Sequence, residues 1–373
     1  MSLLDGIRSQ VNNVRNFRRL FPPEVMARNL VTLPRDYILP SGHAGPPMVV
    51  NMLLTSRCNL RCEMCSVHEF RSRRYREMSP ADVEHVVRQV APYKTSFFLS
   101  GGEPFLRPDM LDLVGVIKRY NLGVGTVTNG LEVTPERGQR LKAMGLDSLM
   151  FSLHGPEEVH DRITGLPGAF RQATANIAAF CKGPRPTNVI LNFVLSRHNM
   201  NSMMEFVEIG RRLGVDRVRI EHLLFMTEHD VSTHEEWCRT HLPKDLREDM
   251  RASTFLCQSA AVDGFAESLP GLLSEVKERH GDFVYIKPAL GSEEIRDWYT
   301  SGYTANRRCI FIWRSLFLDT DGTVIPCQHY MGWRLGNVLH EPLLEIWNSP
   351  RYRTFRRMIR RQLLPACARC CKL

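Results

Sequence analysis

No stretch of this 373-residue chain approaches the roughly 18 apolar residues of a membrane-spanning helix, and its first residues lack the apolar core of a secretion signal. These two absences predict a soluble protein of the cytoplasm. Acidic residues are also in the minority, 40 against 49 lysines and arginines, which leaves a net charge of +9. With 43% hydrophobic residues, the chain can bury a substantial core in one large domain or two.

Cysteine, by contrast, is abundant. Eleven cysteines in a chain without a secretion signal favour metal or redox chemistry over a disulfide framework. Seven of them form a front group and a back group: Cys58, Cys62 and Cys65, then Cys309, Cys327, Cys367 and Cys370. A 4Fe-4S cluster has four irons that each need an outer ligand, so three thiolates leave one iron open and four close the cluster. Zinc is the alternative for both groups, because thiolate sets of this kind also suit that ion.

Three further motifs follow the front group. SGGEP spans Ser100 to Pro104 and comes directly after the apolar run SFFL. Its glycines let the backbone approach a ligand closely, and Glu103 places an acceptor at the end of a probable strand. TVTNG (126–130) and FSLHGP (151–156) come next. A lone Gly-Gly is often only a turn, but the order of all four motifs makes a specific combination.

The Cys-x3-Cys-x2-Cys spacing and these motifs resemble the radical S-adenosylmethionine (SAM) superfamily over residues 48 to 222. The resemblance implies that the front group holds a 4Fe-4S cluster whose open iron chelates SAM. An electron from the cluster then cleaves the sulfonium, and the 5′-deoxyadenosyl radical removes a hydrogen atom from the substrate. The implied SAM contacts are Gly101, Gly102, Glu103, Pro104, Thr128, Asn129, Ser152, His154 and Asn192. His154 departs from a more usual Asp, and Met64 occupies an often aromatic position, but neither change removes a cluster ligand.

Apolar runs alternate with helical patterns through the first 220 residues. The expected strands are 48–54, 96–99, 124–128, 148–153, 189–195 and 217–221, and the expected helices are 80–90, 109–120, 135–144, 169–180 and 200–213. Alternation of this kind predicts an α/β fold with a parallel sheet and crossover helices. The resemblance implies a partial (β/α)6 TIM-like barrel. All four motifs fall at the carboxyl ends of strands, where barrel active sites gather.

The back group belongs to a different pattern. Asp321-Gly322 between two β-rich runs predicts a hairpin that brings Cys309 and Cys327 together, and helices then lead to the last cysteines. This region resembles the SPASM/twitch auxiliary-cluster domain, a small α+β domain. The resemblance implies one auxiliary 4Fe-4S cluster on Cys309, Cys327, Cys367 and Cys370, because no cysteine for a second cluster lies in between. Cys371 could replace Cys370 as a ligand.

Four segments are therefore expected: an N-terminal extension (1–47), the barrel (48–224), a bridge of helices and loops that includes a helix at 270–279 (225–305), and the auxiliary-cluster domain (306–373). The extension has apolar residues at helical spacing with arginines between them, which predicts an amphipathic helix. These residues are Ile7, Val11, Val14, Phe17 and Phe21. We expect this helix to dock against the barrel rather than on a membrane surface.

Arginines gather at two places. The stretch 351–361 contains six, which we interpret as a solvated helix face. The second group, Arg71, Arg73, Arg74 and Arg76, follows the cysteine loop at the expected mouth of the barrel. Arginine forks suit phosphates and carboxylates, so this group predicts an anionic substrate, with a solvated loop as the alternative.

Candidates for proton or hydrogen-atom transfer are few. Glu221 and His222 end the sixth strand and face the proposed site, so either could act as an acid or a base. Cys238 and Cys257 lie in the bridge and could donate a hydrogen atom, although a buried, inert thiol is the more common state of such residues. Cys181 is interpreted as a core residue.

Two classes of function compete. The first is a radical SAM enzyme of biosynthesis, an oxidoreductase or transferase, that uses SAM, two 4Fe-4S clusters and an external electron donor such as flavodoxin or ferredoxin. Its substrate is an anionic small molecule or, alternatively, a ribosomally made peptide. The second class is a metal-stabilised nucleic-acid-binding protein, which a pI of about 9.1 would suit. The GGEP, TNG and SLHG motifs have no role in the second class, so no nucleic-acid partner is expected.

Overall fold

The computed structural model describes residues 20–65, 76–247, 265–300 and 302–373. A single curved sheet runs through these residues in the order β10-β9-β8-β1-β2-β3-β4-β5-β6-β7. Neighbours from β8 to β7 are parallel, whereas β9 and β10 are antiparallel additions. The strands are β1 (Val49–Leu53), β2 (Ser96–Ser100), β3 (Val124–Thr128), β4 (Ser148–Ser152), β5 (Asn188–Val194), β6 (Arg217–Glu221), β7 (Val284–Lys287), β8 (Ser315–Leu318), β9 (Thr323–Ile325) and β10 (Gly336–Asn337).

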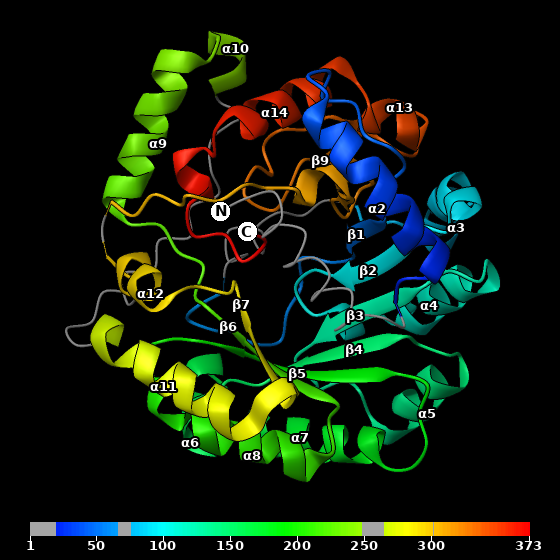
Figure 1. Cartoon of the computed structure of the whole chain (residues 1–373). Helices are drawn as coiled ribbons and strands as arrows, with labels where there is room; N and C mark the ends of the chain where they lie inside the picture. The colour runs from blue at the N-terminus through cyan, green and yellow to red at the C-terminus, as the bar shows by residue number, and fades with distance from the viewer. Residues whose placement is uncertain (1–19, 66–75, 248–264, 301) are drawn as a thin grey trace.

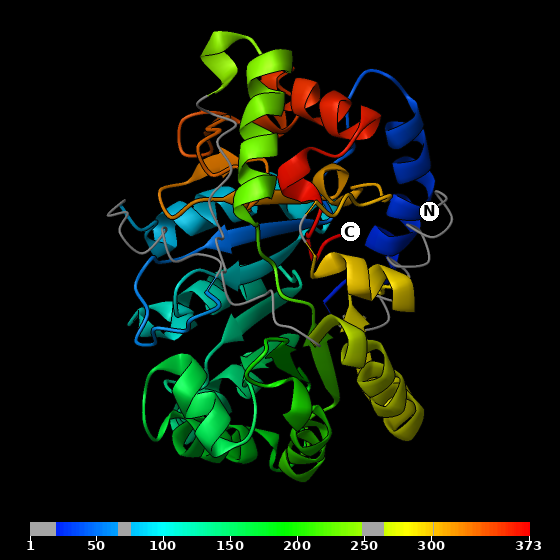
Figure 2. The same cartoon turned by 90° about the vertical axis from the view of Figure 1, so that its left-hand side faces the viewer.

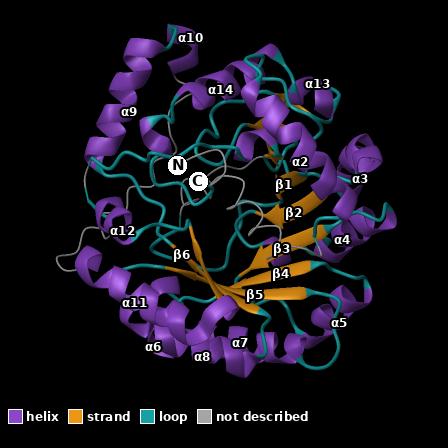
Figure 3. Ribbon diagram, viewed as in Figure 1, coloured by secondary structure: helices purple, strands orange, loops and turns teal. Residues whose placement is uncertain are grey.

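Helices cover the outer face of this sheet, and the C-terminus lies on the inner side of the curve (Figure 1, Figure 3). The helices are α2 (Pro23–Ile38), α3 (Pro80–Val90), α4 (Met110–Arg119), α5 (Pro135–Ala143), α6 (Glu157–Thr164), α7 (Ala169–Cys181), α8 (Met203–Leu213), α9 (Glu228–His241), α10 (Lys244–Arg247), α11 (Phe265–His280), α12 (Ser292–Trp298), α13 (Leu343–Trp347) and α14 (Pro350–Arg361). All six predicted strands form, and the five predicted helices follow the first five of them. The partial barrel is confirmed.

Local chemistry explains these elements. β1 is buried along its whole length and β4 along all but its last residue, as expected of parallel strands that are covered on both faces. α3 begins with a capping box, in which Ser79 and Asp82 each accept a hydrogen bond from the other's backbone amide. Four valines at helical spacing then bury one side of α3 against the sheet.

The bridge contains a strand that the sequence analysis missed. β7 pairs in parallel with β6. It follows α11, which includes the predicted helix at 270–279, so the helix–strand alternation continues beyond residue 224. The expectation of helices and loops alone for the bridge was therefore wrong, because the four residues VYIK are too few to show a clear strand pattern.

The auxiliary-cluster segment extends the barrel's own sheet. β8 pairs in parallel with β1, and β9 returns antiparallel to β8 through the predicted hairpin turn. Gly322 in that turn has a φ of +83°, a conformation that favours glycine. Figure 2 shows the orange segment that contains β8 and β9 beside the blue and cyan start of the sheet. The hairpin therefore lies beside the strand that leads into the cysteine loop.

The arginine-rich helix α14 is only partly solvated. Arg356 is fully buried, with its guanidinium 3.9 Å from the ring centroid of Trp347 and 4.2 Å from that of Tyr352. Arg353 and Arg360 donate to backbone carbonyls between residues 37 and 41. The prediction of a solvated face was wrong for these three arginines, which join α14 to the N-terminal segment.

Most of the predicted N-terminal amphipathic helix, including Ile7, Val11, Val14 and Phe17, lies outside the described residues. Of the segment that follows, Leu20 is buried, and its carbonyl accepts a hydrogen bond of 2.6 Å from the Ser96 hydroxyl on β2. The described end of this segment therefore contacts the barrel. Within the described ranges, no helix has the length and apolar character needed to cross a membrane.

Candidate active site

The cysteine loop follows β1 and is held against the GGEP motif by backbone contacts. The Gly102 amide donates to the Thr55 carbonyl and the Glu103 amide to the Arg57 carbonyl, both at 2.7 Å. A Cβ atom on Gly102 would lie 2.1 Å from the Arg57 carbonyl oxygen, so this close approach requires glycine. The motif therefore fixes the chain immediately before Cys58.

Glu103 is buried, and its carboxylate is held mainly by the end of β3. One oxygen accepts from the Thr128 hydroxyl at 2.8 Å and from the Phe105 amide at 3.0 Å, and the other accepts from the Asn129 amide at 2.7 Å. Burial raises the pKa of Glu103 to about 7 despite these bonds. A cation beside this carboxylate would favour its ionised form. The site therefore fits the role implied for it, contact with the amino group of SAM.

The end of β3 also reaches the cysteine loop. Nδ2 of Asn129 donates to Oδ1 of Asn59 at 2.7 Å. On the far side of the loop, the amides of Arg61 and Glu63 donate to two carbonyls at the end of α6. The sequence analysis assigned a role only to the cysteines of the front motif and so missed Asn59, and it missed α6 because this short helix carries no recognisable motif. Together these contacts support the loop from two sides.

The other predicted SAM residues lie on the next two strands. Ser152 and Asn192 are register partners at the ends of β4 and β5. Oδ1 of Asn192 accepts from Nε of Arg219 at 2.6 Å. His154 is buried, and its ring Nδ1 lies 3.5 Å from the Val194 amide nitrogen; burial lowers its pKa to about 3, so the imidazole is neutral. The fold thus brings these residues to one edge of the sheet, and their individual contacts with SAM stay predictions.

A cavity of about 390 Å³ lies on the inner side of the sheet, and we call it the barrel cavity. Met64 lines it from the cysteine loop, Ser100 from the end of β2, and Cys371 and Lys372 from the C-terminal segment. The barrel cavity therefore lies between the front cysteines and the end of the chain.

Glu221 and His222 both line the barrel cavity. Glu221 forms an ion pair with Arg219. Burial opposes its ionisation, but Arg219, Lys372 and a hydrogen bond with Cys371 outweigh burial and keep the pKa of Glu221 below its ordinary value. Burial lowers the pKa of His222 to about 3. At neutral pH the pair is thus a carboxylate and a neutral imidazole, and acid–base catalysis by either residue stays a prediction.

The arginine group after the cysteine loop is only partly described. Arg76 is exposed, forms an ion pair of 2.6 Å with Asp82 and does not line the barrel cavity. Arg71, Arg73 and Arg74 lie outside the described residues, so their predicted role in substrate binding stays untested. Cys257 likewise lies outside them.

The remaining described cysteines of the bridge and barrel are Cys238, which is buried, and Cys181, which is partly buried. Sγ of Cys238 on α9 lies 3.5 Å from Nε2 of His234, and burial raises its pKa to about 11. Burial raises the pKa of Cys181 to about 11 as well, and this residue packs against the core as predicted. Neither lines the barrel cavity. Hydrogen-atom donation by Cys238 therefore gains no support from its position.

The back group lines a second, smaller cavity, which we call the auxiliary cavity. Its four cysteines are Cys309, Cys327, Cys367 and Cys370. Burial and the neighbouring thiols raise the pKa of Cys327 well above its ordinary value. Backbone amides point at the sulfurs, with the Lys372 amide 3.4 Å from Sγ of Cys370 and two amides bonded to Cys309. Donors of this kind favour thiolates, so the site fits a positively charged iron–sulfur core.

The Cys370-Cys371 doublet divides between the two cavities. Cys370 lines the auxiliary cavity, and Cys371 lines the barrel cavity. The geometry therefore favours Cys370 as the fourth auxiliary ligand over Cys371. Within the described part of the chain, no three His, Cys, Asp or Glu side chains are placed to hold a single metal ion.

The two cavities share a wall. Residues that line both are Phe311, Phe317, Gln328 and Lys372. A molecule in the barrel cavity would therefore lie between the front cysteines and the auxiliary cysteines, separated from the latter by one layer of side chains.

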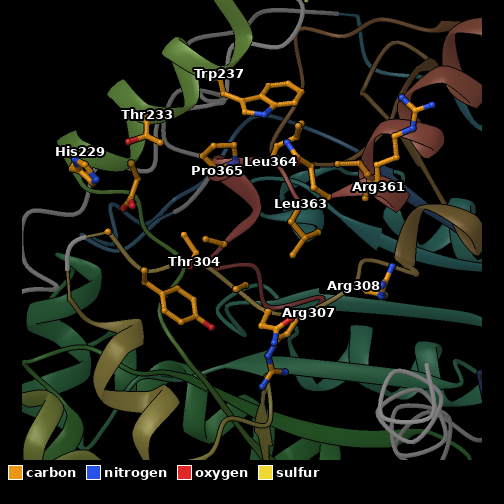
Figure 4. A pocket seen from close by; sticks show the side chains of 18 of the residues that line it. His229, Thr233, Trp237, Thr304, Arg307, Arg308, Arg361, Leu363, Leu364 and Pro365 are labelled. Carbon is orange, nitrogen blue, oxygen red and sulfur yellow. The ribbon is translucent and has the colours of Figure 1, made fainter. Parts of the chain in front are cut away.

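A further pocket, of about 460 Å³, opens between α9, residues 302–308 and the end of α14 (Figure 4). Trp237 on α9, Arg308 and Arg361 are among its lining residues. Arg307, which also lines it, is bound by Glu294 at 2.6 Å. None of the predicted site residues that the structure describes lines this pocket, so we do not assign it to the active site.

Comparison with known proteins identifies the family. Residues 52–210 match the model of the radical SAM superfamily, and residues 309–371 match the SPASM iron–sulfur cluster-binding domain. The PqqA peptide cyclase of Gluconobacter oxydans is 31% identical, over 84% of this chain and 80% of that protein. The AdoMet-dependent heme synthase of Methanosarcina barkeri is 26% identical, over 81% of this chain and 82% of that protein. The chain belongs to the radical SAM superfamily and carries a SPASM domain.

Solved structures agree at the level of the fold. Streptococcus suis SuiB bound to S-adenosylmethionine has a TM-score of 0.62 at 16% identity, over 85% of this chain and 69% of that chain. The enzyme anSMEcpe with bound AdoMet has a TM-score of 0.59 at 19% identity, over 83% of this chain and 82% of that chain. The family and domain matches show that the protein is an enzyme whose cofactors are SAM and iron–sulfur clusters, as the sequence predicted.

Proposed function

We propose that this enzyme removes a hydrogen atom from an anionic small molecule held in the barrel cavity. When bound, a 4Fe-4S cluster with an open iron supplies the electron that cleaves SAM into methionine and a 5′-deoxyadenosyl radical. Cys58, Cys62 and Cys65 would hold this cluster, and Cys309, Cys327, Cys367 and Cys370 would hold one auxiliary cluster. The observation that carries the proposal is the position of the barrel cavity between the two cysteine groups.

The chain's own residues have defined tasks in this scheme. Glu103 and the end of β3 orient the amino group of SAM, and the glycines of GGEP keep that site close to the cysteine loop. Apolar residues of the cavity wall, such as Phe98, Met150 and Phe317, exclude water from a reactive intermediate. The auxiliary cysteines lie across the shared wall from the barrel cavity, and a cluster held by them would accept an electron or order the substrate. An external reductant, such as flavodoxin or ferredoxin, would supply electrons.

A ribosomally made peptide is the second candidate substrate. The relative from Gluconobacter oxydans is a PqqA peptide cyclase, and SuiB has been solved with its precursor peptide SuiA. A cavity of about 390 Å³ lies at the lower end of the range for small-molecule sites and would enclose only part of a peptide. Cavity size thus favours the small molecule.

Deuterium transfer tests this function. The anaerobically reconstituted protein would be reduced with dithionite and incubated with SAM and extracts of deuterium-labelled cells, separated into a low-molecular-mass filtrate and a peptide fraction. We expect deuterium in 5′-deoxyadenosine with the filtrate, and no 5′-deoxyadenosine from a Cys58/Cys62/Cys65→Ala variant. Deuterium transfer from the peptide fraction alone would establish the second candidate instead.

A further inference from the structure

We propose that Lys287 and Lys372 form an anion-binding subsite in the barrel cavity, which binds carboxylate or phosphate groups of the substrate. The inference rests on the proposed function. It assigns anion binding to the end of β7 and the C-terminal segment, whereas the sequence analysis assigned it to the arginines after the cysteine loop. The substrate class that it predicts is a small molecule with two or more anionic groups.

The charge of the cavity lining is the first observation. Arg219, Lys287, Arg314 and Lys372 line the barrel cavity against one carboxylate, Glu221. That carboxylate already forms an ion pair with Arg219. Buried charge is costly unless it is paired, so the excess of positive charge favours an anionic ligand.

Lys287 is the second observation. It ends β7, and among the residues that the structure describes its ammonium has no hydrogen-bond or ion-pair partner. Burial, then Arg219 and Lys372, lower its pKa to about 8, so the side chain is still largely cationic at neutral pH. An anion in the cavity would bind this ammonium without displacing another partner.

A different role for these cations is compensation of cluster charge. Lys372 lines the auxiliary cavity as well as the barrel cavity, so its ammonium could stabilise a reduced auxiliary cluster. Lys287 lines the barrel cavity and does not line the auxiliary cavity. The two roles therefore differ most clearly at Lys287.

Calorimetric titration of the anaerobically reconstituted holoenzyme tests the inference. The probes are glutarate and glycerol phosphate, with the uncharged glutaramide and glycerol as matched controls. We expect the wild type to bind at least one charged probe more tightly than its neutral counterpart, and Lys287→Gln to lose about tenfold in that affinity. The exposed Lys182→Gln should not change it. Lys372→Gln is the second variant and should weaken the same probe.

The outcomes separate the inference from the proposed function. Equal affinity of charged and neutral probes for the wild type would overturn the inference, as would unchanged charged-probe affinity in both lysine variants. A shift in the auxiliary-cluster reduction potential of Lys287→Gln, with charged-probe affinity retained, would assign the lysine to the cluster instead. Failure of the wild type to release 5′-deoxyadenosine would contradict the proposed function, whatever the probes show.

Discussion

Nδ2 of Asn129 donates a hydrogen bond of 2.7 Å to Oδ1 of Asn59, which lies between the first two cysteines of the front group. The backbone amide of Asn129 simultaneously donates to Glu103 at 2.7 Å. One residue at the end of β3 thus contacts both the predicted cluster loop and the predicted site of the SAM amino group. We infer that Asn129 sets the distance between them.

Asn129→Ala should therefore weaken SAM binding while the backbone bond to Glu103 remains. The variant loses the bond to Asn59 and also the bond of 3.0 Å that Oδ1 of Asn129 accepts from the Leu131 amide, but only the first contacts the cysteine loop. One hydrogen bond of this kind contributes about 1 kcal/mol, which corresponds to roughly a fivefold increase in the dissociation constant. Anaerobic calorimetry with SAM would measure it. Asn201→Ala, at an exposed position, is the control. Equal SAM affinity in both variants would contradict a role for the Asn59–Asn129 contact.

Two glycine substitutions should have opposite effects. In Gly102→Ala the new Cβ would lie 2.1 Å from the Arg57 carbonyl oxygen, so the cysteine loop must move. We expect a loss of about 1–3 kcal/mol in unfolding free energy and lower iron content. Gly271→Ala adds a Cβ with no atom within 4 Å at an exposed position of helix α11 and should raise the unfolding free energy by about 0.5–1 kcal/mol. Chemical denaturation would compare them, and a neutral Gly102→Ala would refute the close approach.

Arg356 should be far more important for stability than its neighbour Arg357. Its guanidinium donates to the Gly42 carbonyl at 3.1 Å and to the Ile312 carbonyl at 3.0 Å. Arg356→Met removes both hydrogen bonds and should lower the free energy of unfolding by about 3 kcal/mol or more, because each hydrogen bond to a charged group contributes about 1.5–3 kcal/mol. Arg357→Met, at an exposed position, should stay within about 0.5 kcal/mol. Similar denaturation midpoints for the two variants would show that Arg356 is not an anchor.

Acid should destabilise the fold through its buried histidines. Burial lowers the pKa of His154 to about 3 and that of His160 to about 4. In the unfolded chain each histidine binds a proton below about pH 6.5, whereas in the native state it stays neutral until the pH approaches its lowered pKa. The free energy of unfolding is therefore highest above pH 6.5 and falls as the pH drops. At pH 5 each of the two histidines should lower the free energy of unfolding by about 2 kcal/mol. His160→Gln should flatten the loss of thermal stability between pH 7 and 5, whereas the exposed His85→Gln should not.

The parts of the molecule that the sequence predicted well are those with local signals. The strands of the barrel are short apolar runs followed by helical patterns, and the cysteine, GGEP and TNG motifs each mark the end of a strand. Gly322 occupies a turn with positive φ, a conformation that favours glycine, so the residue type itself indicates the turn. These features need no knowledge of distant residues, so they could be recognised one at a time.

The missed features depend on partners far away in the chain. The pairing of β8 with β1 joins residues more than 260 positions apart, and nothing in either strand specifies it. Arg356 could have been recognised, because it falls on the same helical stripe as the buried Tyr352 and Ile359. Arg219 also carried a signal, since charged residues alternate with Val218 and Ile220 along β6. Lys287 carried no such signal, because the strand that positions it, β7, was itself too short to predict.

Iron content is the most direct test of the two cysteine sites. After anaerobic reconstitution, we predict about eight irons per chain in the wild type, about four in Cys58/Cys62/Cys65→Ala, and a loss of up to four in Cys370→Ala. Cys371→Ala should keep about eight, because Cys371 lines the barrel cavity instead of the auxiliary one. Zinc in place of iron, or an iron content indifferent to the front cysteines, would contradict the account.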